Sequence, residues 1–324
     1  MVTTNSEEPA TTRRPALSWT SLYWASAACV AALILAPAWM LVGNPAVLRG
    51  HPLLPSLLVA AVVVGVVWGV LLWRGRQAFR SRSAVRAVGA WAGRVAVLAL
   101  VAMLVWLNPF AYQAGAAAPG STEAPVAESP TAITMTPEGA PATEGLIFYP
   151  GARVEARAYA DILKPAVDAG FLVVILKTPL NLSLLDGNQA RGVMADHPDI
   201  ATWAVGGHSL GGVTASSFAL GNPDVSGLLL YGSYPLDSLR DRAGLEVLSI
   251  SGTRDGLSTP AKIEASRDLL PLDATFVVVQ GGNHAYFGSY GPQPGDGDPQ
   301  ISREVAQEQI SAASVAFLRQ LGTP

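Results

Sequence analysis

Three long apolar runs near the start of the chain constrain its fold more than any other sequence feature. They predict helices over about residues 20–42, 53–73 and 92–112. An α-helix of about 20 apolar residues is long enough to cross the hydrocarbon core of a bilayer. The length and succession of the runs disfavour two alternatives, buried helices of a larger soluble fold and a cleaved signal peptide for the first run alone. We therefore expect residues 1–112 to form a multi-pass membrane region with three spans.

Arginine placement predicts the orientation of these spans. The segment between the second and third runs carries six arginines and no acidic residue, and Arg13 and Arg14 precede the first run, whereas Arg49 lies on the opposite side. Because Lys and Arg concentrate in cytoplasmic loops, we expect a cytoplasmic N-terminus and an extracellular or periplasmic C-terminal domain. Binding of anionic lipid or nucleic acid is the alternative role for this loop, and its position between two spans favours topology. The six arginines are Arg74, Arg76, Arg80, Arg82, Arg86 and Arg94.

Residues 113–144 differ in composition from the regions on either side. They are rich in Ala, Pro, Thr, Ser and Glu and contain no Lys or Arg. This composition is typical of a flexible or semi-extended linker. Residues 145–324 then form the only stretch that can bury a globular core. The single cysteine, Cys29, lies in the first apolar run, so a disulfide framework is excluded from this domain.

A G-x-S-x-G motif at residues 207–211 lies near the middle of the C-terminal domain. Residues 201–206 predict a short buried strand before it, and residues 213–220 predict a helix after it. This is the strand, sharp turn and helix that a nucleophile elbow requires, with Ser209 strained and its hydroxyl exposed at the carboxyl edge of a sheet. The N–H of Leu210, at the start of the helix, would then face a developing oxyanion. A glycine-rich turn with an ordinary serine is the alternative interpretation.

An acid and a base follow Ser209 in a defined order. Asp255 lies in a turn after the strand-like residues 244–251, and His284 follows a second strand-like run at 274–280. In the order serine, aspartate, histidine, the histidine takes the serine proton and the aspartate fixes the imidazole tautomer. Competing acids have the sequence context of helix-surface or capping residues: Asp237, Asp241, Asp268 and Asp273.

The other histidines have less suitable contexts than His284. His51 lies between apolar runs and His197 precedes a proline. His208 is adjacent to the serine, but strand alternation predicts that its side chain points the other way. His284 is therefore the candidate base, with a loop histidine satisfied by backbone groups as the alternative.

A second oxyanion donor is expected in the loop after an early central strand. Residues 146–149 predict that strand, and residues 150–153 predict the loop. The candidate donor is the N–H of Ala152, and Gly151 would allow a close backbone approach. A plain turn at the end of the strand is the alternative.

The sequence gives no reason to expect a metal or a cofactor. Asp296 and Asp298 lie in a glycine-rich loop, but two carboxylates fall short of the six to eight oxygens that calcium takes. Turn formation and capping of the final helix are the favoured roles. We found no phosphate-binding loop, dinucleotide fingerprint or nucleic-acid module in the sequence.

From Leu146 to the C-terminus, the chain resembles the α/β-hydrolase superfamily, in particular its compact dienelactone hydrolase-like branch. The resemblance implies cleavage of an ester, lactone or thioester through an acyl-enzyme, with Ser209, Asp255 and His284 as the catalytic triad. Dienelactone hydrolases use a cysteine nucleophile, so the serine at position 209 argues against carrying over their specific substrate. The stretches that carry the resemblance are 148–152, 207–212, 251–256 and 281–288.

The expected fold is an α/β-hydrolase fold, with a mainly parallel sheet flanked by helices, preceded by three transmembrane helices. A short helix is expected near residues 236–243, and the interval from Tyr231 to Gly244 leaves no room for a large lid. The sequence thus predicts a membrane-anchored serine hydrolase with a small-molecule or lipid acyl substrate. An acyltransferase with the same triad and a non-catalytic binding protein on a hydrolase fold are the alternatives. Arg-rich, Lys-poor and Ala-rich usage suggests a bacterial source.

Overall fold

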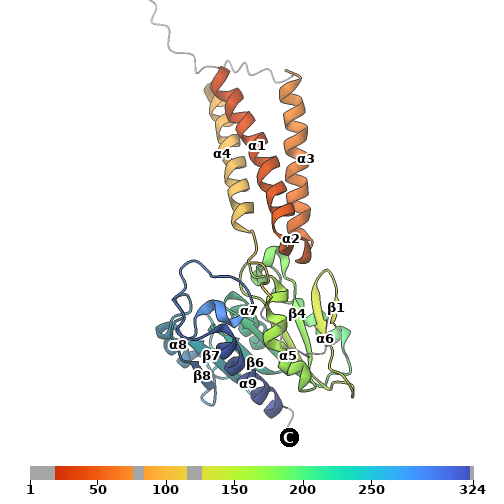
Figure 1. Cartoon of the computed structure of the whole chain (residues 1–324), viewed down its shortest axis with the longest axis vertical. Helices are drawn as coiled ribbons and strands as arrows, with labels where there is room; N and C mark the ends of the chain where they lie inside the picture. The colour runs from red at the N-terminus through yellow and green to blue at the C-terminus, as the bar shows by residue number, and fades with distance from the viewer. Residues whose placement is uncertain (1–18, 76–83, 115–125, 322–324) are drawn as a thin grey trace, which may run out of the picture. The chain divides into compact units, whose positions relative to one another are not determined.

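The structure is a computed structural model that describes residues 19–75, 84–114 and 126–321. The chain divides into two compact units, which can be followed by colour in Figure 1. The first unit contains residues 1–39 and 58–106, and the second contains residues 40–57 and 107–324. The second unit therefore begins well before residue 145 and includes the segment between the first two apolar helices.

Three of the described helices are long and apolar enough to cross a membrane. The first two candidate spans agree with the prediction to within one residue, but the third runs from Val85 to Trp106 and not over residues 92–112. Pro109 lies just beyond this end, and proline has no N–H for the helical ladder and disfavours a helical conformation in the residue before it. The long helices are α1 (Trp19–Gly43), α3 (Leu53–Trp73) and α4 (Ala84–Trp106), and a short α2 (Pro45–Arg49) lies between the first two.

The prediction of an arginine-rich loop is wrong for Arg94, which lies inside α4. Its guanidinium group donates to Ser26 Oγ of α1 at 3.0 and 2.5 Å and to the Ala90 carbonyl at 2.6 Å. A buried charge requires such partners, and Ser26 is too distant in sequence to be recognised as one. Arg86 also lies in α4. Five arginines of the topology prediction are outside the described residues: Arg13, Arg14, Arg76, Arg80 and Arg82.

The second unit is built on an eight-stranded sheet with strand order β1-β2-β4-β3-β5-β6-β7-β8. The neighbours from β4 to β8 in this order are parallel, and β1 and β2 add an antiparallel edge. Parallel neighbours place their carboxyl ends at one edge of the sheet. The strands are β1 (Val126–Glu128), β2 (Ala132–Met135), β3 (Glu144–Tyr149), β4 (Leu172–Leu176), β5 (Thr202–His208), β6 (Val225–Tyr231), β7 (Glu246–Gly252) and β8 (Thr275–Val279).

Strands β1 and β2 come from the segment that the composition assigned to a flexible linker. Ile133 and Met135 alternate with less buried neighbours and are each 3% exposed, so one face of β2 packs on the core. Lys177 fixes the turn between the two strands by donating to Glu128 Oε1 at 2.6 Å and to the Ser129 carbonyl at 2.9 Å. The short period-two pattern in β2 was hidden because composition averages over the whole segment. Residues 115–125 of that segment lie outside the described residues.

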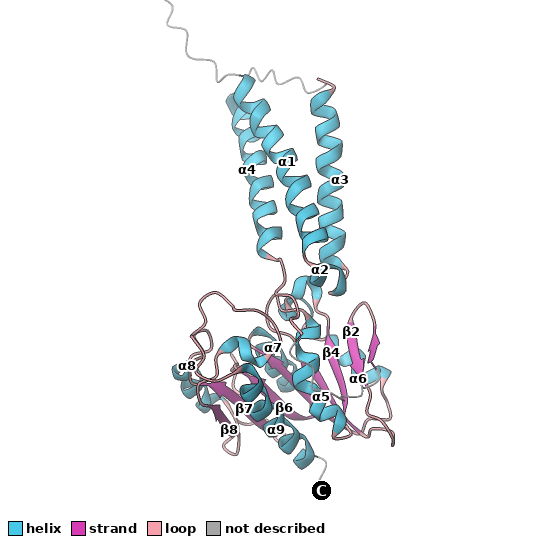
Figure 2. Cartoon of the chain, in the orientation of Figure 1, coloured by secondary structure: helices cyan, strands magenta, loops and turns pink. Residues whose placement is uncertain are grey.

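Helices cover both faces of the sheet, as Figure 2 shows in cyan and magenta. Alternate residues of the central strands join two separate apolar cores, one containing side chains of α5 and α9 and the other containing side chains of α6 and α7. The predicted fold class is confirmed. The α-helices are α5 (Ala160–Asp168), α6 (Gln189–Asp196), α7 (Leu210–Gly221), α8 (Pro260–Ser266) and α9 (Arg303–Leu321). The 3₁₀ turns are η1 (Ala156–Tyr159), η2 (Pro179–Asn181), η3 (Ser183–Asp186), η4 (Arg267–Leu269) and η5 (His284–Phe287).

The helix expected near residues 236–243 is absent from the described structure, where this segment forms bends and turns. Contacts with other elements replace the helical ladder. The N–H of Leu239 donates to the Leu269 carbonyl at 2.7 Å, and Arg242 donates to the carbonyls of Asn222 and Val225 at 2.9 and 3.1 Å. Such contacts lie outside any local sequence pattern.

Candidate active site

Ser209 lies in the sharp turn between β5 and α7, with φ of 51° and ψ of −122°. A positive φ in a non-glycine residue is a strained conformation, which persists where the surrounding structure enforces it. A Cβ atom at Gly207 would collide with the backbone of Gly211, and one at Gly211 would collide with the Tyr149 carbonyl oxygen. The strand and the helix therefore cross at a distance that only glycine permits. This is the elbow geometry that the motif predicts.

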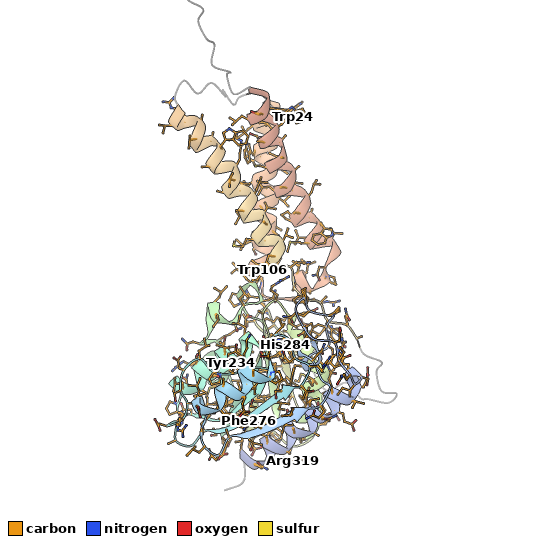
Figure 3. The ribbon with its side chains drawn as sticks, turned by 90° about the vertical axis from the view of Figure 1, so that its left-hand side faces the viewer. Trp24, Trp106, Tyr234, Phe276, His284 and Arg319 are labelled. Atoms are coloured by element: carbon orange, nitrogen blue, oxygen red, sulfur yellow. The ribbon has the colours of Figure 1, made fainter. Side chains whose placement is uncertain are left out.

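The structure brings Asp255 and His284 together at the carboxyl edge of the sheet. His284 Nδ1 lies 2.8 Å from Asp255 Oδ2, and both side chains are fully buried. The other carboxylate oxygen accepts the N–H groups of Leu257 and Ser258 at 2.8 and 2.7 Å. The carboxylate is thus fixed as an acceptor for Nδ1–H, which leaves Nε2 of a neutral imidazole as the acceptor. Figure 3 labels His284 among the side chains of this unit.

Ser209 is brought to the same edge but does not form a hydrogen bond with His284. Nε2 of His284 is buried and has no hydrogen-bond partner among the described residues. Ser209 itself is partly exposed, and its backbone is held by its N–H donating to the Tyr231 carbonyl at 3.0 Å. Catalytic hydrogen bonds are often long without substrate and tighten in the complex. The arrangement therefore leaves Nε2 of His284 free to accept a proton at the same edge of the sheet as the partly exposed Ser209.

Asp296 joins the loops that carry Asp255 and His284. Its Oδ1 accepts the N–H groups of Gly256 and His284, each at 3.1 Å, and that of Gly297 at 2.8 Å. Its Oδ2 accepts the N–H of Ala285 at 2.9 Å. These contacts give Asp296 the turn-forming role that the sequence favours over a metal ligand. They also fix His284 relative to Asp255 from the backbone side.

The two predicted oxyanion donors have N–H groups without partners among the described residues. In the loop after β3, the N–H of Gly151 donates to the Tyr159 hydroxyl at 2.9 Å, and that of Arg153 donates to the Asn181 carbonyl at 2.8 Å. The N–H of Ala152, between them, is left unpaired. Leu210 is the first residue of α7, so its N–H also lacks an intrahelical acceptor and carries part of the positive end of the helix dipole. Both groups are available to an anionic oxygen.

His208, which the sequence argument set aside, lies inside the site. Its ring is fully buried, with its centroid 4.4 Å from that of His284, and its Nδ1 lies 2.8 Å from the Tyr159 hydroxyl. Because that hydroxyl accepts the Gly151 N–H, its own hydrogen is free for Nδ1. These two hydrogen bonds, through the Tyr159 hydroxyl, link the loop after β3 to His208, the residue before Ser209. A histidine inside the motif was the only sequence signal for it.

The electrostatics of this pair favour neutral groups. Burial lowers the pKa of His208 well below its usual value, repulsion from His284 lowers it further, and the His284 backbone partly opposes the shift. Burial also raises the pKa of the Tyr159 hydroxyl, although the hydrogen bond from Gly151 partly opposes this. His208 and Tyr159 are therefore neutral near pH 7 and act through hydrogen bonds.

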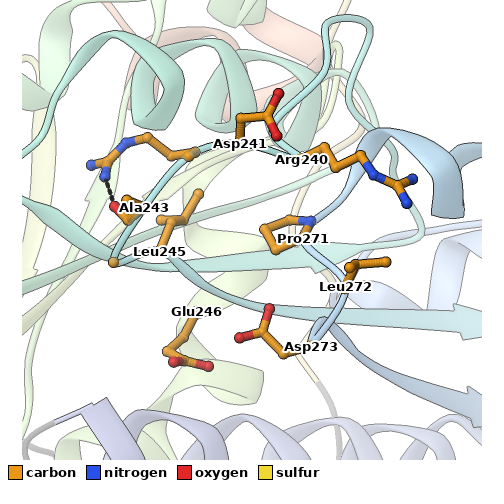
Figure 4. Close-up of a pocket in the computed structure, with 10 residues that line it drawn as sticks. Arg240, Asp241, Ala243, Leu245, Glu246, Pro271, Leu272 and Asp273 are labelled. Carbon is orange, nitrogen blue, oxygen red and sulfur yellow. Dashed lines mark hydrogen bonds between the residues drawn. The ribbon is translucent and has the colours of Figure 1, made fainter.

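The opposite edge of the sheet carries an open pocket of about 430 Å³, shown in Figure 4. Glu246 begins β7 and Asp273 precedes β8, so this pocket lies at the amino ends of the strands. Asp241 and Asp273, two of the acids that compete with Asp255 in the sequence, line it. They are consequently at the wrong edge to orient His284.

Comparison with known families identifies the family to which this chain belongs. A sequence model described as the alpha/beta hydrolase family matches residues 145–308, about half of the chain and the whole of the candidate site. This chain belongs to the alpha/beta hydrolase family. The family match supports a hydrolase. No curated protein matches the chain.

Solved structures similar to this α/β hydrolase include enzymes of the dienelactone hydrolase type. The dienelactone hydrolase from Anabaena variabilis is 15% identical, with a TM-score of 0.44, covering 58% of this chain and 90% of its own. A dienelactone hydrolase-like promiscuous phosphotriesterase from metagenomic libraries is 16% identical, with a TM-score of 0.46 and coverages of 59% and 92%. The esterase domain of a Rhodothermus marinus protein is 13% identical, with a TM-score of 0.46 and coverages of 59% and 93%.

Proposed function

We propose that this α/β hydrolase is a membrane-anchored serine hydrolase that cleaves a carboxylic ester, lactone or thioester through an acyl-enzyme on Ser209. The contact that carries the proposal is the buried hydrogen bond between His284 Nδ1 and Asp255 Oδ2, at the edge where Ser209 occupies its strained turn. A carboxylate in this position holds the imidazole in the tautomer that accepts a proton and stabilises the imidazolium that then forms.

The reaction follows from these positions. His284 Nε2 takes the proton of Ser209 as Oγ bonds to the acyl carbon, and the carbonyl electron pair moves to the oxygen. The N–H groups of Leu210 and Ala152 stabilise that oxyanion. When the tetrahedral intermediate collapses, the bond to the leaving oxygen or sulfur breaks, and His284 returns the proton to the leaving group. Water then attacks the acyl-enzyme by the same route and releases the carboxylic acid.

A serine-directed fluorophosphonate probe tests the proposal against a non-catalytic binding protein. We expect the full-length protein in detergent to be labelled and Ser209→Ala to lose the label while it keeps its thermal unfolding transition. Labelling that persists in Ser209→Ala, or no labelling of folded wild type, would defeat the proposal.

Product analysis separates hydrolysis from acyl transfer. The same acyl-enzyme can be resolved by an alcohol, so an ester substrate is incubated with increasing concentrations of an added alcohol acceptor. We expect the free acid to remain the main product. Dominant transfer to the acceptor would replace the hydrolase assignment with an acyltransferase.

The long apolar helices suggest membrane association, and we propose that the N-terminus is cytoplasmic and the hydrolase domain is extracellular or periplasmic. The basis is the arginine content of residues 74–82, because Arg86 and Arg94 lie in α4 and do not count as loop charges. A reporter fused after Pro324 that is active only outside the cytoplasm is the expected result. Activity only in the cytoplasm would reverse the orientation.

A further inference from the structure

Two segments that adjoin the candidate spans belong to the same compact unit as the candidate site. They are residues 44–51, which contain α2, and residues 107–113, and we call them the juxtamembrane collar. Asn44 Nδ2 joins the two segments by donating to Asn108 Oδ1 and to the Pro109 carbonyl, each at 2.8 Å. Arg49 Nη1 lies 4.0 Å from Glu155 Oε1 of the hydrolase domain.

The collar holds the loop that carries Ala152. The N–H of Phe110 donates to the Arg153 carbonyl at 2.6 Å, and the Phe110 carbonyl accepts the N–H of Glu155 at 3.0 Å. Glu155 is 2% exposed, and its Oε2 accepts the N–H of Tyr112 at 2.7 Å. One rim of the candidate site is therefore built on collar residues.

Each collar segment begins directly after the last residue of a candidate span. Asn44 follows Gly43, the last residue of the first span, and Phe110 is four residues beyond Trp106, the last residue of the third. Because a chain extends at most about 3.5 Å per residue, the backbone of Phe110 lies within about 14 Å of that span end. Chain connectivity alone therefore keeps the Phe110 backbone near the end of that candidate span.

Exposed leucines lie within the collar and next to it in the same unit. Leu48 of α2 is 62% exposed, and Leu184 and Leu185 of η3 are 59% and 56% exposed. Gly50 of the collar packs against the Asn181 side chain just before η3, and Ser183 of η3 lies 2.7 Å by its hydroxyl from Thr214 of α7, the nucleophile helix. Large apolar side chains gathered at the water boundary of a span are suited to the bilayer interface.

We propose that the Ser209 site takes its acyl group from a lipid ester in the adjoining bilayer leaflet, with Leu48, Leu184 and Leu185 inserted into the interface beside the site. This inference rests on the proposed function and adds its substrate class. The span ends at Gly43 and Leu53 flank α2 directly, which is why the bilayer, and not a protein partner, is the occupant of this apolar surface. Once Leu184 and Leu185 are in the interface, an acyl ester could reach Ser209 without crossing bulk water.

The test compares two substrates for full-length protein reconstituted in vesicles of phosphatidylcholine and phosphatidylglycerol. The first readout is fatty acid release from the vesicle lipids, and the second is hydrolysis of soluble p-nitrophenyl acetate. We expect the double variant Leu184→Ser with Leu185→Ser to lose at least about tenfold of the first rate and to keep the second within about twofold. Leu272→Ser is the matched control, because Leu272 is 86% exposed at the opposite edge of the sheet. It should leave both rates unchanged.

The outcomes separate this inference from the proposed function. Soluble ester hydrolysis that depends on Ser209, together with no release from vesicle lipids, would overturn the lipid substrate and leave the serine hydrolase standing. Equal effects of the double variant on both substrates would overturn the interfacial role of the leucines. Loss of neither rate in Ser209→Ala would overturn the proposed function itself.

Discussion

The two edges of the sheet differ in backbone strain and in the burial of their charged side chains. At the carboxyl edge lie all the described non-glycine residues with positive φ, together with the buried pair of Asp255 and His284. The amino edge has the pocket of about 430 Å³, which is lined by charged residues such as Arg240 and Glu246. None of the described non-glycine residues at this edge has a positive φ. Backbone strain and buried polar contacts cost free energy unless the fold supports them. They therefore identify the candidate site better than the volume of a pocket does. The strained residues are Arg153, Leu180, Asn181 and Ser209.

The largest expected difference between the edges concerns their carboxylates. Asp255→Asn keeps the shape of the side chain but removes the charge that orients His284, so we expect kcat to fall by about 10³- to 10⁴-fold. Asp241→Asn, in the amino-edge pocket, is the matched control and should change kcat by less than about twofold. Steady-state kinetics with a soluble ester measures both. Similar losses in the two variants would remove the distinction between the edges.

A smaller effect is expected from the tyrosine behind the oxyanion loop. Tyr159→Phe leaves the N–H of Gly151 and Nδ1 of His208 without their shared partner, so the position of Ala152 is less well fixed. We expect kcat to fall about 10- to 100-fold with KM nearly unchanged. Tyr149→Phe is the control, because the Tyr149 hydroxyl donates to the Gly187 carbonyl at 2.7 Å, away from this loop.

A positioning role is distinguished from a general effect on stability by comparing the change in kcat with the change in the free energy of unfolding. Each tyrosine variant loses the two hydrogen bonds of its hydroxyl, so both should lower the free energy of unfolding by about 1–3 kcal/mol. Only Tyr159→Phe should lower kcat. A proportional loss of kcat in Tyr149→Phe would show that both tyrosines act through stability.

The smallest expected effect is a pH dependence of stability at the carboxyl edge. Because burial lowers the pKa of His208 in the native state, only the unfolded state takes up a proton there below pH of about 6.5. Above that pH, the protonation of His208 does not lower the free energy of unfolding. Below it, preferential protonation of the unfolded state lowers the free energy of unfolding by about 1.4 kcal/mol per pH unit. Burial lowers the pKa of His51 too, which adds a slope of the same sign.

Denaturant unfolding at several pH values between about 5 and 8 measures this slope. His208→Gln removes this titrating group and should make the acid limb less steep, with the slope from His51 remaining. An acid limb of equal slope in wild type and His208→Gln would contradict the neutral, buried state of His208.

The sequence predicted the parts of the carboxyl edge that rest on local patterns. The elbow around Ser209 needs only the glycines at positions 207 and 211 and the flanking strand and helix, all within about 20 residues. Asp255 and His284 could be proposed because each follows a strand in a parallel sheet, and such strands share one carboxyl edge. Their hydrogen bond is the geometric consequence of that order.

The remaining features depend on residues that are distant in the sequence. Asn44 and Asn108 are 64 positions apart, and Ser26 and Arg94 are 68 apart, so no local pattern reveals either contact. Composition averaged over residues 113–144 concealed β2, whose short apolar alternation acquires meaning only beside β4. Strand alternation puts His208 on the same face as Ala204, where its ring contacts Tyr159 and Phe287. Alternation could not show that the loop carrying His284 also packs over that face, which brings the two histidine rings to 4.4 Å.

The central claim is that Ser209 carries the acyl group during turnover. The most direct measurement is rapid acid quenching of the full-length protein with a slowly released ester, followed by mass analysis of the proteolytic peptide that contains Ser209. We predict an acyl mass increment on that peptide in wild type and none in Ser209→Ala. Undiminished ester turnover by Ser209→Ala, or an acyl adduct confined to another residue, would contradict the account.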